Sequence, residues 1–548
     1  MHRRVFQIVL ALTCVAALWR FVDIGRDPDV VTESSQDAWG DPASYLYNAR
    51  SHVLFGDWRV SEGVTMFAAP GYTLLASLCL ATFGVDFRST LIMAMLSGFA
   101  VIAATALFAG TASRLDGDLP PRYAAAAAAV LLLGSYIVFA HQHVPNGDME
   151  ALAVSSLAAL CLAQLQSIDP NTKRLKFRAL AVLGGFGIGM APFVKLHNGI
   201  FAISAVAAWV VSYYALDEDW RSQWRAATPW LAAGAVIAIS AWVGWALWIY
   251  RISAEGALRS QLDRLRIFSV LTARPDDKDY NPKGTFALFR YFQSNLMYRQ
   301  PVEVVLATLG FFTFLSSRRK NWPMFFACTW WLAGVAVMTN ITPDPLRYRL
   351  IVWPAVVILA SCFWARLANG FQDQTGGWPG LATVLGLGIV LGSIAVYLGT
   401  VKLHHSVSIP LQLAVFIVAT VAAYSIVAAL RRIEPQIVAS TLALLLVMVN
   451  VPQWIAGERH VSYELAEAAA RLDKYPANYV LGGGWGVRLG FSSTKDIYMS
   501  WTPEAKRKVD LYVEDKVSLS DIPFPWHEME RHTMRRVPLE IVFVRIDR

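Results

Sequence analysis

The residues best suited to chemistry are two carboxylates that stand beside apolar segments of the chain. Asp41 lies between the first and second apolar segments, and Asp148 follows the third. Ionisable groups so close to a bilayer are costly and commonly functional, and a carboxylate held there could act as a general base towards an attacking hydroxyl group. The structural alternative is that each acid caps the N-terminus of a helix, with Pro42 at the first helical position after Asp41.

Three basic residues at the ends of other apolar segments, Lys195, Arg347 and Arg349, could stabilise a developing negative charge. Such groups form charge-assisted hydrogen bonds with a leaving phosphate, and a guanidinium can hold two phosphate oxygens at once. Arg347 and Arg349 are two residues apart, so on a helix they would not share one face and one of them should dominate. The alternative is that these long side chains reach out to the membrane interface.

Asp41 and Asp148 could also hold a divalent metal ion between them, although two carboxylates are a small set of ligands. No cofactor is predicted beyond this ion. If Asp41 activates an acceptor on the face opposite to a leaving phosphate, a single displacement would invert the reacting carbon.

The composition excludes most classes of soluble protein. Of the 548 residues, 55% are hydrophobic and only 16% are charged, and the mean hydropathy is +0.42. An ordinary soluble domain carries about a quarter charged residues. The net charge of +8 arises before residue 458, because residues 458–548 hold 14 basic and 14 acidic residues. No basic, aromatic-interleaved motif is present, so nucleic acid is not expected as a partner.

Thirteen apolar segments are long enough to cross a membrane, which requires about 20 mostly apolar residues. They are 5–23, 89–113, 123–144, 149–166, 179–194, 199–216, 226–250, 302–317, 323–341, 350–368, 379–401, 410–430 and 437–456. A further stretch, 66–85, carries Pro70 and Gly71 near its start. We expect it to be a re-entrant or interfacial helix on the outer side.

Basic residues predict the orientation of these segments, because short cytoplasmic loops are rich in Lys and Arg. With thirteen crossings, the short loops on one side carry 13 basic residues and those on the other side carry 4. The first side is therefore predicted to be cytoplasmic, and the N-terminus with it. The long loops 24–88 and 251–301 and the tail 458–548 are then predicted to lie outside.

The tail is predicted to be a soluble α/β domain that follows a transmembrane catalytic domain over residues 1–457. A helical pattern covers 463–472, and short strands are predicted at 479–481 and 539–544. The glycine-rich run from Gly482 to Gly486 lacks the ending of a phosphate-binding loop and is predicted to be a turn. We expect this domain to cover the site or to select the acceptor.

The first outer loop resembles that of the GT-C glycosyltransferases, most of all the aminoarabinose transferase and protein mannosyltransferase branch. That pattern is Asp-Glu-x-x-Tyr, and the matching run here is Asp41-Pro42-Ala43-Ser44-Tyr45, with Ala49-Arg50 and Gly56-Asp57-Trp58 after it. The second acid of the pattern is absent. Ala69-Pro70-Gly71-Tyr72 stands where many members carry Lys-Pro, so the Lys is absent too.

Three later segments extend the resemblance over most of the chain. Asp148 stands where the family has its second active-site Asp. The run Val194-Lys195-Leu196-His197-Asn198-Gly199 resembles the segment that opens the sixth span, and Pro345-Leu346-Arg347-Tyr348-Arg349-Leu350 resembles an Arg-Tyr segment before a later span. The resemblance implies a GT-C bundle of about 13 transmembrane helices with an outer domain. It also implies that Asp41 and Asp148 are catalytic and that Tyr45, Lys195, Arg347 and Arg349 bind substrate.

The sequence therefore predicts an integral membrane glycosyltransferase, placed in a bacterial inner membrane. It would transfer a sugar from a polyprenyl-phosphate donor to a lipid, glycan or protein acceptor of the envelope. The alternatives are a multi-span transporter or lipid flippase, and an oligosaccharide ligase with a diphosphate-linked donor. The acids at the membrane face, the outer tail and the lack of an internal repeat favour the enzyme over the transporter.

Overall fold

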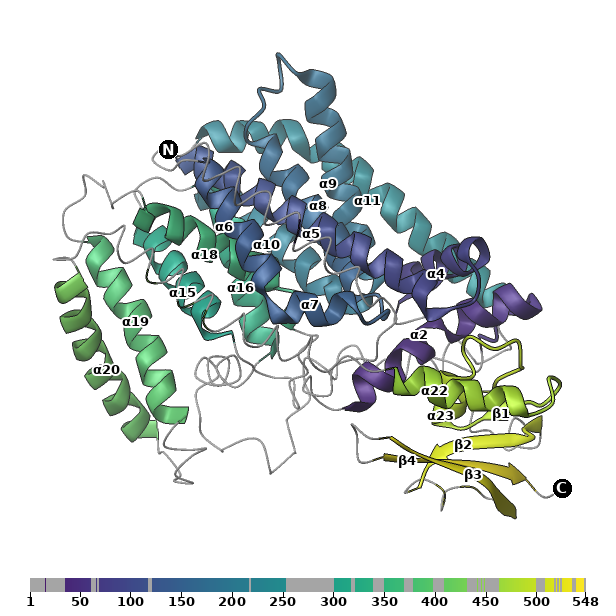
Figure 1. The fold of residues 1–548 in the computed structure, drawn as a ribbon. Coiled ribbons are helices and arrows are strands. Elements are labelled where there is room, and N and C mark those ends of the chain that lie inside the picture. Colours follow the sequence, from purple (N-terminus) through teal and green to yellow (C-terminus); the bar gives the residue numbers. More distant parts are fainter. Residues whose placement is uncertain are drawn as a thin grey trace.

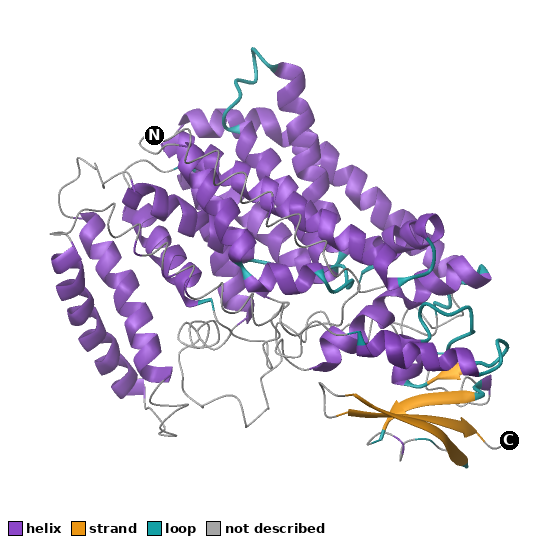
Figure 2. Ribbon diagram, viewed as in Figure 1, coloured by secondary structure: helices purple, strands orange, loops and turns teal. Residues whose placement is uncertain are grey.

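A computed structural model shows how these segments are arranged. The residues it describes are 35–60, 69–116, 121–215, 218–252, 300–316, 321–338, 349–368, 378–397, 409–430, 463–498, 508–516, 525–534 and 539–546, with a few isolated positions. The predicted spans 5–23 and 437–456 and nearly all of the predicted loop 251–301 lie outside these residues. Helices make up most of the described chain, and the strands are confined to its C-terminal part (Figure 2).

Twelve helices of the described chain form the apolar bundle. They are α5 (Phe87–Asp116), α6 (Pro121–Gly134), α7 (Tyr136–Gln142), α8 (Asp148–Leu165), α9 (Arg174–Val194), α10 (Gly199–Ala215), α11 (Glu218–Ile252), α15 (Pro301–Ser316), α16 (Trp322–Met338), α18 (Trp353–Ala368), α19 (Trp378–Tyr397) and α20 (Ile409–Leu430). Among the described residues, five helical stretches are long and apolar enough to cross a membrane, and shorter apolar helices accompany them. The chain is an integral membrane protein.

The helices pack side by side in a continuous series. Helix α11 packs on α9, α9 on α8, α8 on α5, and α5 on α6. The series continues through α18 and α15 to α19 and α20, the pair at the left edge of Figure 1. The helical hairpin of α8 and α9 runs from the connection 166–173 to the opposite end of the bundle, where the loop 143–147 and Lys195 lie. The predicted site residues Asp148 and Lys195 lie at this second end.

Glycines bring α9 and α11 into backbone contact. A side chain at Gly185 would collide with the carbonyl of Leu231, and one at Gly234 would collide with that of Val182. Small residues allow this close approach between apolar helices, which gain little from the hydrophobic effect inside a lipid bilayer. The close contact fixes the position of α9, whose C-terminal end carries Lys195.

Several predicted spans differ in detail from the structure. The predicted span 123–144 is divided into α6 and α7 by a break at Ser135, whose hydroxyl accepts a hydrogen bond from Gln300. The predicted span 226–250 is part of the longer helix α11. The stretch 66–85 contains α4 (Pro70–Phe83), which starts at Pro70, where the missing N–H costs no helical hydrogen bond.

Helix α2 (Ser35–Phe55) packs on α4 and also on the C-terminal part of the chain. Tyr45, Leu46 and Ala49 belong to an apolar cluster with α4. Ala43 and Tyr47, one helical turn apart, belong instead to the core of the C-terminal sheet. One helix therefore joins two parts of the molecule that are far apart in the sequence (Figure 1).

The C-terminal part is built on a four-stranded sheet. Its strands are β1 (Leu481–Gly482), β2 (Leu511–Asp515), β3 (Trp526–Met534) and β4 (Leu539–Ile546), in the order β1-β2-β4-β3. The pair β1 and β2 is parallel and the other two pairs are antiparallel. We call this sheet, together with α22 (Glu464–Ala470), η3 (Arg471–Lys474), α23 (Gly484–Leu489) and the loop 490–498, the C-terminal unit.

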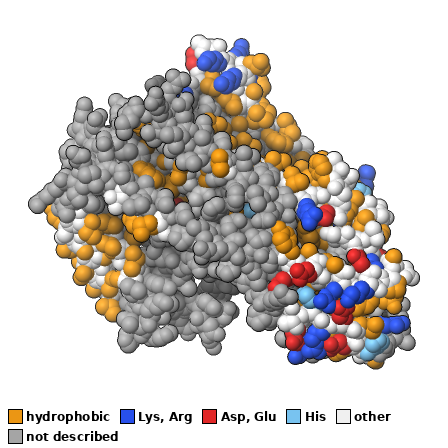
Figure 3. All heavy atoms as spheres, viewed as in Figure 1, with side chains coloured by type: hydrophobic (Ala, Val, Ile, Leu, Met, Phe, Trp, Pro, Cys, Tyr) orange, Lys and Arg blue, Asp and Glu red, His pale blue; other side chains and the backbone are white. Residues whose placement is uncertain are grey.

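Alternation along β4 gives the sheet two apolar faces. Ile541 and Phe543 pack on the helices and on α2, whereas Val542 and Val544 pack on the opposite side with Tyr512. The surface of the unit is charged, and it contrasts in Figure 3 with the apolar surface of the helices. This contrast is typical of a water-exposed unit attached to a membrane bundle.

Candidate active site

Three of the predicted site residues meet in one buried cluster. The Lys195 ammonium lies 2.7 Å from Asp148 Oδ1, and the two side chains are only 1% and 5% exposed. The same Nζ atom donates a hydrogen bond of 2.9 Å to the carbonyl oxygen of Asn146 and lies 4.4 Å from the centre of the Tyr45 ring. A cation at this distance from an aromatic ring is attracted to it. The cluster therefore joins α2, the start of α8 and the end of α9.

The backbone around Asp148 places its carboxylate towards Lys195. Gly147 adopts a φ of +83°, and a side chain there would collide with the ring of Tyr72. This left-handed residue suits glycine and starts α8 at Asp148. The Asn146 side chain accepts a hydrogen bond from the Asp148 N–H. Asp148 is thus the first helical residue and not the cap, and its carboxylate forms an ion pair.

Lys195 occupies the sharp exit from α9. The helix contains Pro192 and ends at Val194, and Lys195 is extended, with a φ of −152°. A short 3-10 helix, η1 (Leu196–Asn198), follows and leads into α10. The change of direction turns the ammonium towards Asp148. A buried ion pair of this kind needs good geometry and further hydrogen bonds to offset desolvation, and the ammonium has one such bond, to the Asn146 carbonyl.

Two more buried polar groups border the cluster. The Glu150 side chain is buried, and neither of its carboxylate oxygens has a hydrogen-bond partner among the described residues. The same holds for the hydroxyl group of the fully buried Tyr72. Glu150 stands two residues after Asp148, in the first turn of α8. The carboxyl groups of Asp148 and Glu150 therefore both lie in the part of the site that contains Lys195.

The whole fold is similar to that of two solved structures of ArnT from Cupriavidus metallidurans, one in the apo state and one bound to undecaprenyl phosphate. Each matches with a TM-score of 0.54 and 16% sequence identity, and the match covers 98% of this chain and 97% of the other. No protein-family model and no curated protein matches the sequence. ArnT is an aminoarabinose transferase with the GT-C fold, and the chain therefore has a GT-C fold. The resemblance that the sequence indicated is therefore confirmed at the level of the fold.

Within the GT-C fold, Asp41 lies in the body of α2. The alternative that it caps this helix is wrong, because α2 begins at Ser35. Asp41 stands four residues before Tyr45, so the backbone places both on the same helical face. The structure describes the backbone of Asp41 and not its side chain, and its approach to Asp148 stays a prediction.

The three predicted phosphate-binding residues have different surroundings. Lys195 is held by Asp148, Asn146 and the ring of Tyr45, and a contact with phosphate stays a prediction. Arg349 is buried at the turn before α18. Arg347 lies outside the described residues.

No group of three or more His, Cys, Asp or Glu side chains that could hold a metal ion gathers in the part of the chain that the structure describes. The predicted ion between Asp41 and Asp148 would need the undescribed side chain of Asp41. Sequence reasoning did not single out Asn146, Glu150 or Tyr72. Asn146 and Glu150 stand two residues on either side of Asp148, and Tyr72 belongs to the run Ala69-Pro70-Gly71-Tyr72. The contacts of Asn146 with Asp148 and Lys195, and of Tyr72 with Gly147, arise only in the folded chain.

Proposed function

We propose that this protein transfers a sugar from a polyprenyl-phosphate donor to an envelope acceptor, which is a lipid, a glycan or a protein. The observation that carries the proposal is the meeting of Tyr45, Asp148 and Lys195 from three separate segments. The GT-C fold supports the same class of reaction, as does the undecaprenyl phosphate bound to one of the ArnT structures.

Lys195 gives Asp148 its role in this proposal. A carboxylate held by a buried ammonium keeps one orientation. Asp148 then accepts hydrogen bonds from hydroxyl groups of the acceptor or the sugar. Asp41, on the same face of α2 as Tyr45, takes the proton of the attacking hydroxyl group, as a general base does.

The leaving phosphate requires positive charge on the side opposite to the attack. Arg349 and Arg347 are the groups we propose for this role, because a guanidinium binds two phosphate oxygens at once. A displacement of this geometry inverts the anomeric carbon. Lys195 reaches the phosphate only if donor binding weakens its bond to Asp148.

The proposal also includes a location and an orientation. Residues 1–457 form the catalytic domain in a bacterial inner membrane, with the N-terminus in the cytoplasm. Residues 458–548 form a domain outside the membrane, and the reaction takes place on that side. The charged surface of the C-terminal unit and its position beside α2 support this arrangement (Figures 1 and 3).

The test is a transfer assay with purified protein in lipid vesicles. Synthetic undecaprenyl phosphate carrying a radiolabelled sugar is the donor, with mannose and aminoarabinose tried in turn. Envelope lipid, glycan and protein fractions are offered separately as acceptors. We expect transfer with one donor and one fraction. A flippase would move the labelled lipid across the bilayer without transferring the sugar.

Asp148→Asn should lower transfer by a factor on the order of a hundred to ten thousand, the usual range for a group that handles a proton or orients the reactants. Asp169→Asn is the matched control, because Asp169 is exposed and its contacts are local. Near-normal turnover of a folded Asp148→Asn protein would exclude Asp148 from the reaction.

A second pair of variants tests Asp41 and does not disturb the ion pair. Asp41→Asn should abolish most transfer, and Asp37→Asn, one turn earlier on α2, should have much less effect. Melting temperatures of all four variants separate lost chemistry from lost folding. Equal activity of Asp41→Asn and Asp37→Asn would remove the proposed base.

A further inference from the structure

Helix α2 packs one of its faces on the helical bundle and another on the C-terminal unit. Tyr45 faces the bundle and lies over Lys195, whereas Ala43 and Tyr47 are part of the core of the C-terminal unit. Arg50 follows Tyr47 by three residues and therefore lies on the same face as Tyr47. The position of Tyr45 over Lys195 thus depends on how α2 is seated against the C-terminal unit.

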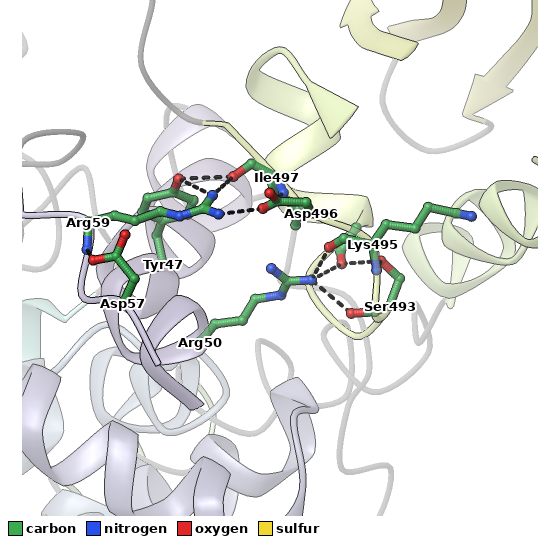
Figure 4. A network of polar contacts seen from close by, with 9 residues as sticks. Tyr47, Arg50, Asp57, Arg59, Ser493, Lys495, Asp496 and Ile497 are labelled. Carbon is green, nitrogen blue, oxygen red and sulfur yellow. Dashed lines mark hydrogen bonds and ion pairs between the residues drawn. The ribbon is translucent and has the colours of Figure 1, made fainter. Parts of the chain in front are cut away.

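The side chain of Arg50 binds the backbone of the loop 490–498. Arg50 is 1% exposed, and its guanidinium donates from Nε and Nη2 to four carbonyl oxygens of this one loop. Figure 4 shows how the group points at Ser493 and Lys495. The acceptors are Phe491 at 2.7 Å, Ser493 at 2.7 Å, Lys495 at 2.8 Å and Gly490 at 3.3 Å. The flat, rigid fork of a guanidinium suits several fixed acceptors, which a lysine ammonium does not match.

The charge of Arg50 has no direct carboxylate partner among the described contacts. Burial lowers the pKa of Arg50 to about 10, while the more distant Asp496 opposes the change. The side chain therefore stays cationic at neutral pH. The hydrogen bonds between a buried guanidinium and carbonyl oxygens are strongly directional, because each carbonyl must point at an N–H group of the guanidinium.

Arg59 adds a second connection to the same loop. Its Nη1 donates a hydrogen bond of 2.7 Å to the carbonyl oxygen of Ile497, and its Nη2 lies 2.7 Å from Asp496. Tyr47 donates to the same Ile497 carbonyl at 2.9 Å. Arg59 has a φ of +46°, which is unfavourable for a residue other than glycine. Asn48 holds this conformation by donating to the Arg59 carbonyl.

We propose that the C-terminal unit positions α2 against the Asp148–Lys195 pair, and that Arg50 is the positioning residue. The inference rests on the proposed function, because it assigns α2 a role in that reaction. A displacement of about 1 Å at a reacting group can lower a rate about a hundredfold. The C-terminal unit therefore contributes to turnover through backbone contacts made outside the membrane bundle.

The first test substitutes Arg50 in the full-length protein. Arg50→Gln removes the fork, and we expect kcat to fall about 10- to 100-fold while KM for the donor changes less than threefold. Arg50→Lys keeps the charge and should restore only a small part of kcat. Arg531→Gln is the control, because Arg531 is an exposed arginine on β3 of the C-terminal unit. Full rescue by Arg50→Lys, or unchanged kcat in Arg50→Gln, overturns the inference.

A double-mutant cycle separates positioning from simple loss of folded protein. Groups that act as a unit have non-additive effects. In an Asp148→Asn background, Arg50→Gln should lower the residual rate by less than threefold. A reduced folded fraction would instead lower the rate by the same factor in both backgrounds. That second result would leave Arg50 with a structural role only.

Hydrogen exchange provides a readout that does not depend on activity. Arg50→Gln should speed amide exchange in residues 43–55 of α2, while exchange in α8 and α9 stays as in the wild type. Unchanged exchange in α2 overturns the inference. If the wild-type protein transfers no sugar, the proposed function fails, and faster exchange confined to α2 would still show that Arg50 seats this helix.

Discussion

Lys195 and Arg50 are two buried cations that differ in what they hold. Lys195 lies inside the bundle, and its principal partner is the carboxylate of Asp148. Arg50 lies between α2 and the C-terminal unit, and its described partners are backbone carbonyls of one loop. The first contact fixes the direction of a carboxylate. The second contact fixes the backbone of the loop 490–498 against α2. The two regions should therefore respond differently to substitution.

The largest effect on stability is expected where a buried carboxylate loses a close ammonium group. Lys195→Met removes the ammonium 2.7 Å from Asp148 Oδ1, which should cost about 3–5 kcal/mol of unfolding free energy. Denaturant unfolding of the purified protein measures this loss. Lys474→Met, at an exposed lysine, is the control. Adding Asp148→Asn to Lys195→Met should recover much of the stability; if it does not, the pair is not the source of the loss.

The ring of Tyr45 should have the next largest effect. Tyr45→Leu removes the aromatic face over the Lys195 ammonium and should cost about 1–2 kcal/mol. Tyr45→Phe keeps the face and should cost much less. The comparison uses the same unfolding measurement, with transfer assayed in parallel. Equal stability of the two variants would mean that the ring contributes by packing alone.

A smaller effect is expected on the side of the C-terminal unit. Tyr47→Phe removes the hydrogen bond to the Ile497 carbonyl, which also accepts from Arg59, and a weaker one of 3.3 Å that the Tyr47 hydroxyl accepts from Arg59 Nη1. The loss should be about 0.5–1.5 kcal/mol, because the acceptor keeps a partner. Thermal unfolding should show it. A loss as large as that of Lys195→Met would remove the contrast between the two regions.

The smallest effect is expected at the surface of the C-terminal unit and depends on pH. Burial alone would raise the pKa of the Glu530 carboxyl group, but hydrogen bonds from Lys474 and Arg471 hold it below its ordinary value. A lowered carboxyl pKa stabilises the protein above pH 4.5, and this contribution is lost as the pH falls below that value. Glu530→Gln should lower stability by about 1 kcal/mol or less at pH 7.

This last prediction is checked by melting the wild type and Glu530→Gln across a pH series. Their difference should shrink on acidification and nearly vanish at low pH. A difference that grows as the pH falls would have the wrong sign for an ionised Glu530.

The residues of the site could be predicted from the sequence better than their contacts. Asp148 and Lys195 were indicated by their charge beside apolar segments, and Tyr45 by the resemblance of the first outer loop to the GT-C pattern. Their meeting depends on how α2, α8 and α9 pack, which no local pattern contains. The capping alternative for Asp41 relied on Pro42, which is compatible with a helix start at that point but does not require one.

In the C-terminal unit, too, the local sequence could predict elements but not contacts between residues that are far apart in the sequence. The residues from 539 alternate as a strand does, and β4 covers Leu539–Ile546. The glycine run predicted to be a turn instead contains the end of β1 and the start of α23. Gly483, with a φ of +87°, joins the two, and Glu514 accepts a hydrogen bond from the Gly484 N–H. That acceptor lies on another strand, so the local sequence could not indicate it.

The separation between Arg50 and its acceptors also has a consequence for biosynthesis. Arg50 and Phe491 are 441 residues apart. At about 5–20 residues per second, the ribosome needs roughly 20–90 s to make the intervening chain. Throughout that interval α2 has been synthesised, but the loop 490–498 that Arg50 binds has not. Helix α2 can therefore make its contacts with this loop only after these 441 residues have been added, and we expect nascent chains that stop before residue 490 to be inactive.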